Sequence, residues 1–205
     1  MEKKAISQVG NAAGITRVLW KEILPGDRRK FIAKSHDADT GGGARDLRFR
    51  GDDELEAIIL AMFPDQEKAL RRRKGAATDI TRNRGLFCWR STVGEKHVIK
   101  SEFAYIEPPT TAREGEWRIT RVHTYEVFQG QLPPERIDDR VLLLLIQTGD
   151  GKIWPRFTTE ASLRKDKWSA AVKKQILGCL DSKKSTRRAS YGFIDLQNGG
   201  THCHV

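Results

Sequence analysis

Long apolar runs, a signal peptide and a regular cysteine pattern are all missing from this sequence of 205 residues. The longest purely apolar runs are Ala57–Phe63 and Val141–Ile146, and both are far short of the roughly 20 residues that a membrane-spanning helix needs. The N-terminal Met-Glu-Lys-Lys leads into mixed polar residues and not into the apolar core of a signal peptide. We therefore expect a soluble, cytoplasmic protein with no membrane partner.

The three cysteines are Cys88, Cys179 and Cys203, and no CxxC pair occurs among them. An odd, scattered set is typical of reduced intracellular thiols, so we expect no disulfide framework. His202 and His204 flank Cys203, and residues two apart on a strand face the same side, where both imidazoles could bind one Zn²⁺. No cluster of further ligands accompanies them, which favours a frayed terminal strand. We therefore predict no metal site and no cofactor.

The usual signatures of enzymes are also missing. The sequence has no GxxxxGK[ST], HExxH or GxSxG motif, and Gly41–Gly43 lacks the GxGxxG frame of a nucleotide-binding loop. Asp65, Glu67 and Lys68 resemble the acidic residues and lysine of metal-dependent nucleases. They crowd the end of one predicted helix, however, whereas nuclease carboxylates usually lie on two strands. We predict no catalytic residue, and a nuclease with an unrecognised metal site is the first alternative.

Positive charge is what the sequence has in excess. Lys and Arg total 37 against 27 Asp and Glu, which gives a net charge of +10 and a pI near 9.7. Such a balance favours a partner that carries many phosphates. Two basic runs, 68–74 and 183–188, could contact phosphates without base preference, although a solvated surface explains them equally well. A basic protein–protein adaptor is therefore the second alternative.

Three segments have the apolar spacing of a helix. Ile15–Leu24 is one, and Asp53–Phe63 is another, with Asp52 as its N-cap. Thr159 precedes the longest, Glu160–Leu180. Residues 65–85 are rich in Lys and Arg and poor in apolar residues, and we expect a flexible basic loop there.

Short segments with alternating, β-branched or aromatic residues predict strands. Val141–Gln147 is apolar throughout, so we expect it to be buried on both faces. About seven short strands with two or three helices and no internal repeat indicate one α+β, mainly β domain that spans residues 1–205 as a small barrel or curled sheet. The predicted strands are Arg29–Lys34, Arg45–Phe49, Leu86–Thr92, His97–Glu107, Trp117–His123, Val141–Gln147, Ile153–Phe157 and Tyr191–Leu196.

Two loops between these strands, Lys34–Arg45 and Thr110–Arg121, mix basic and acidic residues with Thr and Gly. Arg contacts guanine bidentately in the major groove, and Asp or Glu can accept a hydrogen bond from cytosine N4. Carboxylates would weaken simple phosphate binding, so their presence in basic loops favours base recognition. Ordinary turn chemistry is the alternative, because Asp, Thr and Gly also favour turns.

The same loops carry a resemblance to a known family. Lys34-Ser-His-Asp-Ala-Asp-Thr-Gly-Gly-Gly, then Leu47-Arg-Phe and the helix ending Met62-Phe63-Pro64, resembles the first recognition arm of the EcoRII restriction endonuclease effector-binding domain. Arg113-Glu114 and Arg118-Ile-Thr-Arg121 resemble its second arm. Ala44-Arg45 stands where that family usually has His-Gln, and the family's catalytic domain has no counterpart here.

The resemblance implies an open seven-stranded pseudobarrel with flanking helices, related to the plant B-three domain. It also implies double-stranded DNA binding with some sequence preference, through two arms in the major groove. The chain would be the specificity module of a restriction–modification system, and a separate nuclease subunit or domain would be a further partner. The arms would mix base and phosphate contacts. Their candidate residues are Lys34, His36, Asp39 and Arg45 in the first arm and Arg113, Glu114, Arg118 and Arg121 in the second.

Overall fold

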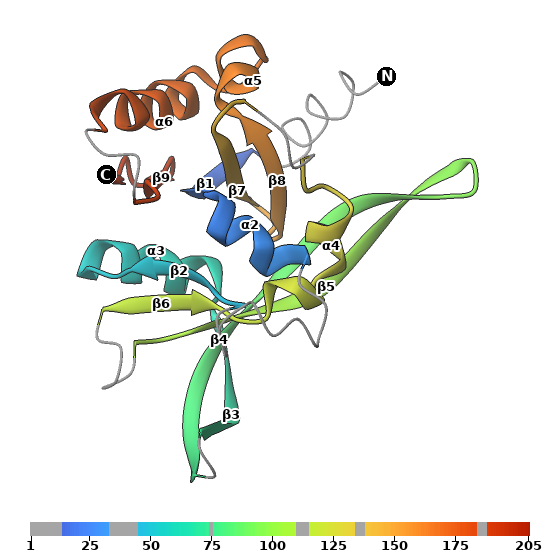
Figure 1. Ribbon diagram of the computed structural model, residues 1–205, viewed down its shortest axis with the longest axis vertical. Helices are drawn as coiled ribbons and strands as arrows, with labels where there is room; N and C mark the ends of the chain where they lie inside the picture. The colour runs from blue at the N-terminus through green and yellow to red at the C-terminus, as the bar shows by residue number, and fades with distance from the viewer. Residues whose placement is uncertain (1–13, 33–44, 74–75, 110–114, 134–137, 184–187) are drawn as a thin grey trace.

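The computed structural model describes residues 14–32, 45–73, 76–109, 115–133, 138–183 and 188–205, and of residues 71–73 and 76–77 only the backbone. Ten strands form a single sheet (Figure 1). The strands are β1 (Ile15–Glu22), β2 (Leu47–Arg50), β3 (Asp65–Arg73), β4 (Ala76–Val93), β5 (Lys96–Glu107), β6 (Glu116–Ile119), β7 (Val141–Thr148), β8 (Ile153–Thr159), β9 (Tyr191–Asp195) and β10 (Thr201–His204). The described helices are α2 (Pro25–Ile32), α3 (Asp53–Met62), the 3₁₀ turn η3 (Val122–Thr124), α4 (Glu126–Gln129), α5 (Glu160–Lys165) and α6 (Ala170–Ser182).

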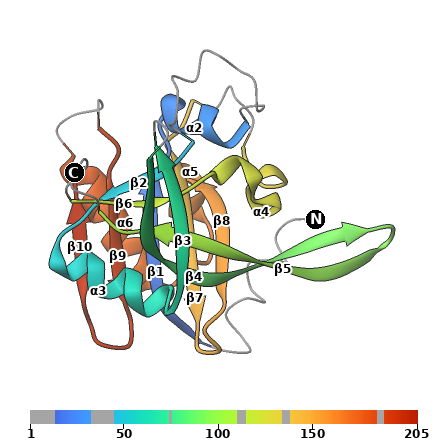
Figure 2. The same cartoon turned by 90° about the horizontal axis from the view of Figure 1, so that it is seen from below.

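The sheet runs in the order β10-β9-β1-β7-β8-β4-β5-β6-β2, and β3 pairs with the first half of β4. Its two ends curl toward each other (Figure 2). Tyr191 on β9 donates a hydrogen bond to the carbonyl oxygen of Arg50 on β2 at 2.9 Å. The rings of Phe49 and Tyr191 also meet edge to face. Within the described residues no backbone ladder joins β2 to β9 or β10, so the sheet is curled but open.

Two cores lie on opposite sides of this sheet. The inner core fills the curl and takes side chains from α2, α3 and α4. The outer core packs β1, β7 and β9 against α5 and α6. Leu143 and Leu145 on β7 point into the inner core, and Leu142 and Leu144 point into the outer one. The apolar strand is therefore buried on both faces, as the sequence predicted.

The outer surface of one half of the sheet has no described helix packed on it. Helices α2, α3 and α4 send their buried side chains to the inner core, and α5 and α6 cover only the β1–β7–β8–β9 half. In the part of the chain that the structure describes, no helix covers the outside of β2, β4, β5 and β6. We call this surface the open face.

Strand β4 is the longest and projects from the body in both directions. Its first half pairs with β3 over Ala76–Arg84, and its second half pairs with β5 over Asn83–Val93. Figure 1 shows both two-stranded ribbons extending away from the curled sheet. The prediction of a loop over residues 65–85 is therefore wrong, because backbone pairing with β4 makes up for the scarcity of apolar anchors.

Two other predicted elements have the wrong type. Ile15–Leu24 is not a helix: Ile15–Glu22 is a central strand, paired with β7 and β9 on its two sides. The predicted strand Arg29–Lys34 is wrong over Arg29–Ile32, which belong to the helix α2 that begins at Pro25, and its last two residues lie outside the described residues. Proline is favoured at the first position of a helix, so Pro25-Gly26 starts this helix instead of ending one.

Most of the remaining elements agree with the predictions. Helix α3 begins after Asp52, whose carboxylate accepts a hydrogen bond from the Leu55 amide at 2.8 Å. Thr159 caps α5 in the same way, but the predicted long helix is two helices, α5 and α6. Trp117–His123 is partly a strand, since β6 ends at Ile119 and η3 follows. The α+β, mainly β class is confirmed, whereas the predicted number of seven strands is wrong. No described helix has both the length and the apolar character needed to cross a membrane.

The expectation of three reduced thiols is also wrong. Cys179 on α6 and Cys203 on β10 form a disulfide, and Cys88 is buried as a free thiol. Pairing of β10 with β9 places Cys203 beside the last turns of α6. The spacing of the cysteines in the sequence does not indicate this proximity.

We expect reduction of the Cys179–Cys203 disulfide to lower the free energy of unfolding by about 3 kcal/mol, because the bond closes a loop with a sequence separation of 24. In a chain of this length that corresponds to a fall in Tm of about 6–12 °C. Thermal melts with and without a thiol reductant measure the effect. Cys203→Ser should melt low under both conditions, and equal melting of oxidised and reduced wild type would contradict the prediction.

Candidate nucleic-acid interface

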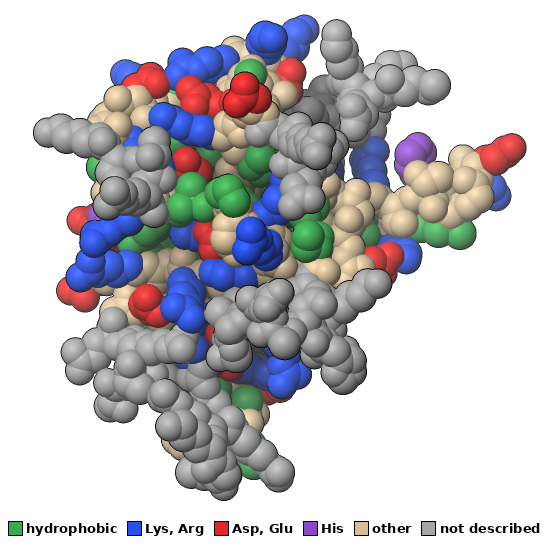
Figure 3. Space-filling view, viewed as in Figure 1, with side chains coloured by type: hydrophobic (Ala, Val, Ile, Leu, Met, Phe, Trp, Pro, Cys, Tyr) green, Lys and Arg blue, Asp and Glu red, His purple; other side chains and the backbone are tan. Residues whose placement is uncertain are grey.

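Arginines alternate along the strands of the open face. Successive residues of a strand face opposite sides, so Arg82 and Arg84 on β4 share the outer side while Asn83 points inward. The strand register places Arg118 of β6 opposite both Arg48 of β2 and Glu107 of β5. Figure 3 shows blue Lys and Arg side chains on the part of the molecule over which β2 and β6 run.

Arg118 lies in the middle of this surface but is only 3% exposed. Its guanidinium pairs with the Asp46 carboxylate and with the Glu107 carboxylate, each at 3.5 Å. Both partners are themselves buried. Arg118 therefore ties the segment before β2 to β5 and β6, and its guanidinium is not presented to solvent.

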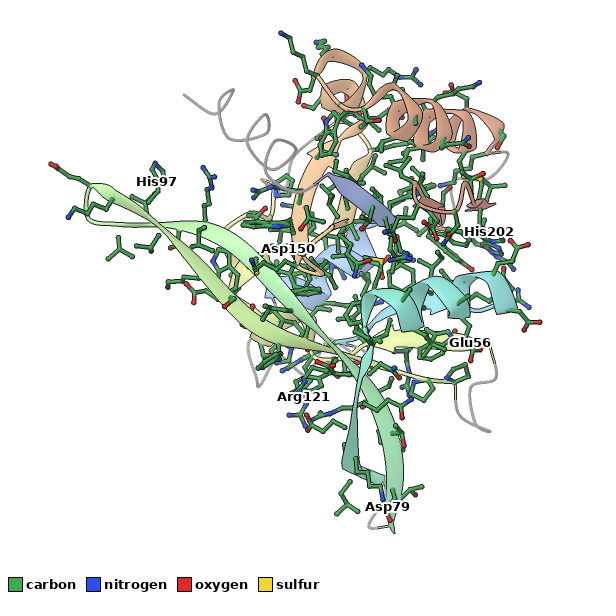
Figure 4. All side chains as sticks on the ribbon, turned by 180° about the vertical axis from the view of Figure 1, so that it is seen from behind. Glu56, Asp79, His97, Arg121, Asp150 and His202 are labelled. Atoms are coloured by element: carbon green, nitrogen blue, oxygen red, sulfur yellow. A yellow bond between two sulfur atoms is a disulfide. The ribbon has the colours of Figure 1, made fainter. Side chains whose placement is uncertain are left out.

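Arg45 and Arg121, one from each predicted arm, meet at the end of the β2–β6 pair. The Arg45 Nη1 lies 3.2 Å from Nε2 of His123. The Arg121 amide donates a hydrogen bond to Asp46 at 3.3 Å, and the Val122 amide donates one to the Arg45 carbonyl at 2.9 Å. Arg121 is exposed, and Figure 4 shows it near the centre of the molecule's rear view. We call Arg45, Arg121 and His123 the arginine junction.

The chemistry of His123 follows from its neighbours. A guanidinium can only donate, so Nε2 accepts from Arg45 and the imidazole proton resides on Nδ1. Nδ1 is buried and has no hydrogen-bond partner among the described residues. Burial lowers the pKa of His123, and the positive charges of Arg45 and Arg121 lower it further. The imidazole is therefore neutral near pH 7, and positive charge at this point comes from the two arginines.

The backbone of Arg121 is in the left-handed region, with φ of 53°. It is the only non-glycine residue with a positive φ in the described part of the chain. The Thr124 amide and hydroxyl both donate to the Arg121 carbonyl at 2.8 Å, which helps to hold this conformation. Such conformations cost of order 1–3 kcal/mol and cluster at functional sites.

The described residues that adjoin the two predicted arms lie at opposite ends of the β2–β6 pair. Residues 33–44 lead into Arg45, beside the arginine junction. Residues 110–114 lead into Gly115, whose carbonyl accepts a hydrogen bond from the Gly51 amide at the far end of β2. The six-residue step from Arg45 to Gly51 corresponds to about 20 Å of extended chain. Part of the open face thus lies between Arg45 and Gly115, the described residues that follow residues 33–44 and 110–114 in the sequence.

Arg82 and Arg84 stack on aromatic rings of β5. Each guanidinium lies over the ring diagonally opposite, Arg82 at 3.9 Å from the Tyr105 centroid and Arg84 at 4.4 Å from the Phe103 centroid. Glu67 on β3 pairs with Arg82 at 2.6 Å, and the neighbouring Asp65 pairs with Arg84 at 3.7 Å.

These pairs bear on the nuclease alternative. The carboxylates of Asp65 and Glu67 contact arginines, and Lys68 points to the opposite side of β3 from Glu67. The described residues contain no group of three His, Cys, Asp or Glu side chains that could hold a metal ion.

The histidines near the C-terminus contact protein groups as well. His202 on β10 lies 3.0 Å from Asp52 and 3.4 Å from Glu54 at the start of α3, and His204 stacks on Tyr191. Figure 4 shows His202 beside α3. The His202 contacts link β10 to the segment that follows β2, at the other end of the curled sheet.

Of the eight predicted arm residues, Arg45 and Arg121 are brought together, and Arg118 is an interior ion-pair residue. The other five lie outside the described residues: Lys34, His36, Asp39, Arg113 and Glu114. Sequence reasoning missed the pairing of arginines with aromatic rings. The signal was present in Arg82-Asn-Arg84 and Phe103-Ala-Tyr105, two alternating patterns that become one surface only when β4 and β5 pair.

Comparison of the chain with protein-family models, with curated proteins and with solved structures finds no match.

Proposed function

We propose that this protein binds double-stranded DNA with a sequence preference, through the open face and the two arms that flank it. The observation that carries the proposal is the arginine junction, in which the Arg45 guanidinium contacts a neutral imidazole and the exposed Arg121 lies close enough to lower the pKa of that imidazole. Two like charges held together this way favour an anionic ligand, and a DNA phosphate supplies one. The net charge of +10 would draw the DNA to the protein.

In this proposal Arg45 and Arg121 contact phosphate and set the register of the duplex. Base recognition belongs to the arms, with Lys34, His36 and Asp39 in the first and Arg113 and Glu114 in the second. The curled, open sheet of ten strands would be an enlarged form of the pseudobarrel that the resemblance implies. The described residues would supply binding, and cleavage would belong to a separate nuclease subunit or domain. Sequencing of duplexes selected by the protein from a random library tests the sequence preference.

Salt dependence tests the phosphate contacts. Neutralising about five phosphates gives a slope of log affinity against log salt of about −4 to −5. In Arg45→Ala/Arg121→Ala the slope should be smaller in magnitude by about 2, because two phosphate contacts are lost. Fluorescence anisotropy of a labelled duplex at several salt concentrations measures this slope.

Arg164→Ala is the matched control, since Arg164 is an exposed arginine on α5, on the helix-covered side of the sheet. It should leave the slope unchanged. Equal slopes for wild type and the double variant would remove the arginine junction from the interface. Absence of duplex binding even at low salt would overturn the proposed function.

A further inference from the structure

We propose that the open face also carries a stacking site for an unpaired DNA base, formed by Arg82, Arg84, Phe103 and Tyr105. This inference rests on the proposed function in that DNA is the ligand. The stacking site differs from the proposed function in the chemical group that is bound. It binds the flat face of a base, whereas the proposed function concerns phosphates and the edges of paired bases.

The geometry provides two neighbouring planar surfaces. The Arg82 and Arg84 guanidinium groups each lie over an aromatic ring, and the two pairs are adjacent because Phe103 and Tyr105 are two residues apart on β5. Arginine planes and aromatic rings are the surfaces on which proteins stack unpaired bases, and the contact tolerates any base because every base has a π-face.

The exposure of Phe103 is the second observation. Its side chain is 49% exposed, on a sheet face that no described helix covers. Of the nine large apolar residues that are exposed in the described part of the chain, four lie on β4 and β5, and these are Val93, Val98, Ile99 and Phe103. Successive residues of a strand face opposite sides, so Ile99 lies on the same side of β5 as Phe103, and Val98 lies on the other side. Of the four, Phe103 alone is an aromatic ring with a guanidinium over it.

The carboxylates beside the rings fit a base better than they fit an apolar peptide. Glu67 and Asp65 face the guanidinium groups and are acceptors for the amino and imino hydrogens at a base edge. Hydrogen bonding from Arg82 lowers the pKa of Glu67, so this acceptor stays ionised at neutral pH. A planar cation, an aromatic ring and an acceptor within one site match the face and the edge of a nucleobase.

The ligand has to be an unpaired base because the faces of paired bases are covered within the duplex stack. The site lies close to the arginine junction. Tyr105 is two residues from Glu107 along β5, Glu107 pairs with Arg118, and Arg118 pairs with Asp46, the neighbour of Arg45. One DNA molecule can therefore contact both sites, with its phosphates at the junction and an unpaired base at the rings.

The test compares three DNAs by fluorescence anisotropy: a single strand of about 12 nucleotides, a fully paired duplex of about two helical turns, and the same duplex with one unpaired base. Phe103→Leu removes the ring but keeps an apolar side chain. It should weaken binding of the single strand, and of the duplex with the unpaired base, about 5- to 100-fold. Affinity for the paired duplex should stay within about twofold, because that DNA exposes no base face.

Two further variants sharpen the result. Arg84→Lys keeps the charge and removes the planar guanidinium, so it should reproduce the selective loss. Ile99→Ala changes another exposed apolar residue of β5 that has no aromatic ring, and it should bind all three DNAs as wild type does. Melting temperatures of the variants establish that each is folded before its affinity is compared.

The outcomes separate this inference from the proposed function. Duplex binding with unchanged single-strand affinity in both Phe103→Leu and Arg84→Lys overturns the stacking site and leaves the proposed function standing. Equal losses on all three DNAs also overturn it, because they reduce the site to general electrostatics. Absence of binding to any DNA overturns both proposals.

Discussion

Arg118→Ala should lower the free energy of unfolding by about 3–5 kcal/mol, and it should do so without a selective loss of DNA base preference. Truncation removes the guanidinium that faces Asp46 and Glu107, and leaves two buried carboxylates without the cation between them. A buried charge whose partner is removed is strongly destabilising. Urea denaturation of the variant and wild type gives the difference directly.

Arg48→Ala is the matched control, because Arg48 lies opposite Arg118 in the ladder and makes a half-exposed pair with Glu116 at 3.9 Å. Its loss should cost at most about 1 kcal/mol, as is usual for exposed ion pairs. The prediction is contradicted if Arg118→Ala is as stable as wild type and instead loses discrimination between a preferred duplex and a random one. That result would restore Arg118 to the base-contacting role that its sequence motif indicates.

Arg118 and Arg121 show why the candidate site could be predicted only in part. The sequence places both in one basic segment, and nothing in their spacing separates an interior ion pair from an exposed cation. The difference arises because β6 ends at Ile119 and the chain turns through the left-handed Arg121. The partners that decide each role, Asp46 and Glu107, are distant in sequence and become neighbours only through the pairing of β2, β5 and β6.

The fold was predictable where local signals and tertiary context agree. Asp52 and the apolar stripe of α3 define that helix on their own, and the apolar run of β7 defines a buried strand. At Ile15–Glu22 they disagree: apolar spacing suggested a helix, but the segment is paired on both sides and buried on both faces. Two of its charged residues are inside, where Glu22 accepts hydrogen bonds from Lys183 at 2.5 Å and from the Ser190 amide at 2.9 Å. Because these partners are distant in sequence, the local pattern around Glu22 could not indicate that it is buried.

The inner aromatic cluster is where the second large effect is expected. Phe128 on α4 is fully buried and meets four other rings edge to face, with centroids 5.1 to 6.0 Å away. These rings come from α2, β4, β8 and the residue before α4, and they are Phe31, Phe87, Phe157 and Tyr125. Phe128→Ala should therefore lower the free energy of unfolding by about 3–5 kcal/mol, through lost transfer energy and the cavity it leaves.

Phe103→Ala is the comparison variant, because it shows whether the exposed ring of the proposed stacking site is also needed for folding. Phe103 is half exposed, so its truncation should cost much less stability than that of Phe128, even though both residues are phenylalanines in ring contacts. Chemical denaturation of both variants under the same conditions measures the contrast. Equal losses of unfolding free energy in the two variants would show that Phe103 is needed for folding. A small loss in Phe128→Ala would contradict the prediction, because the surrounding helices would then be stable without the aromatic cluster. The expected contrast would show that the fold does not depend on Phe103, so its ring and the Arg84 guanidinium over it can serve a ligand.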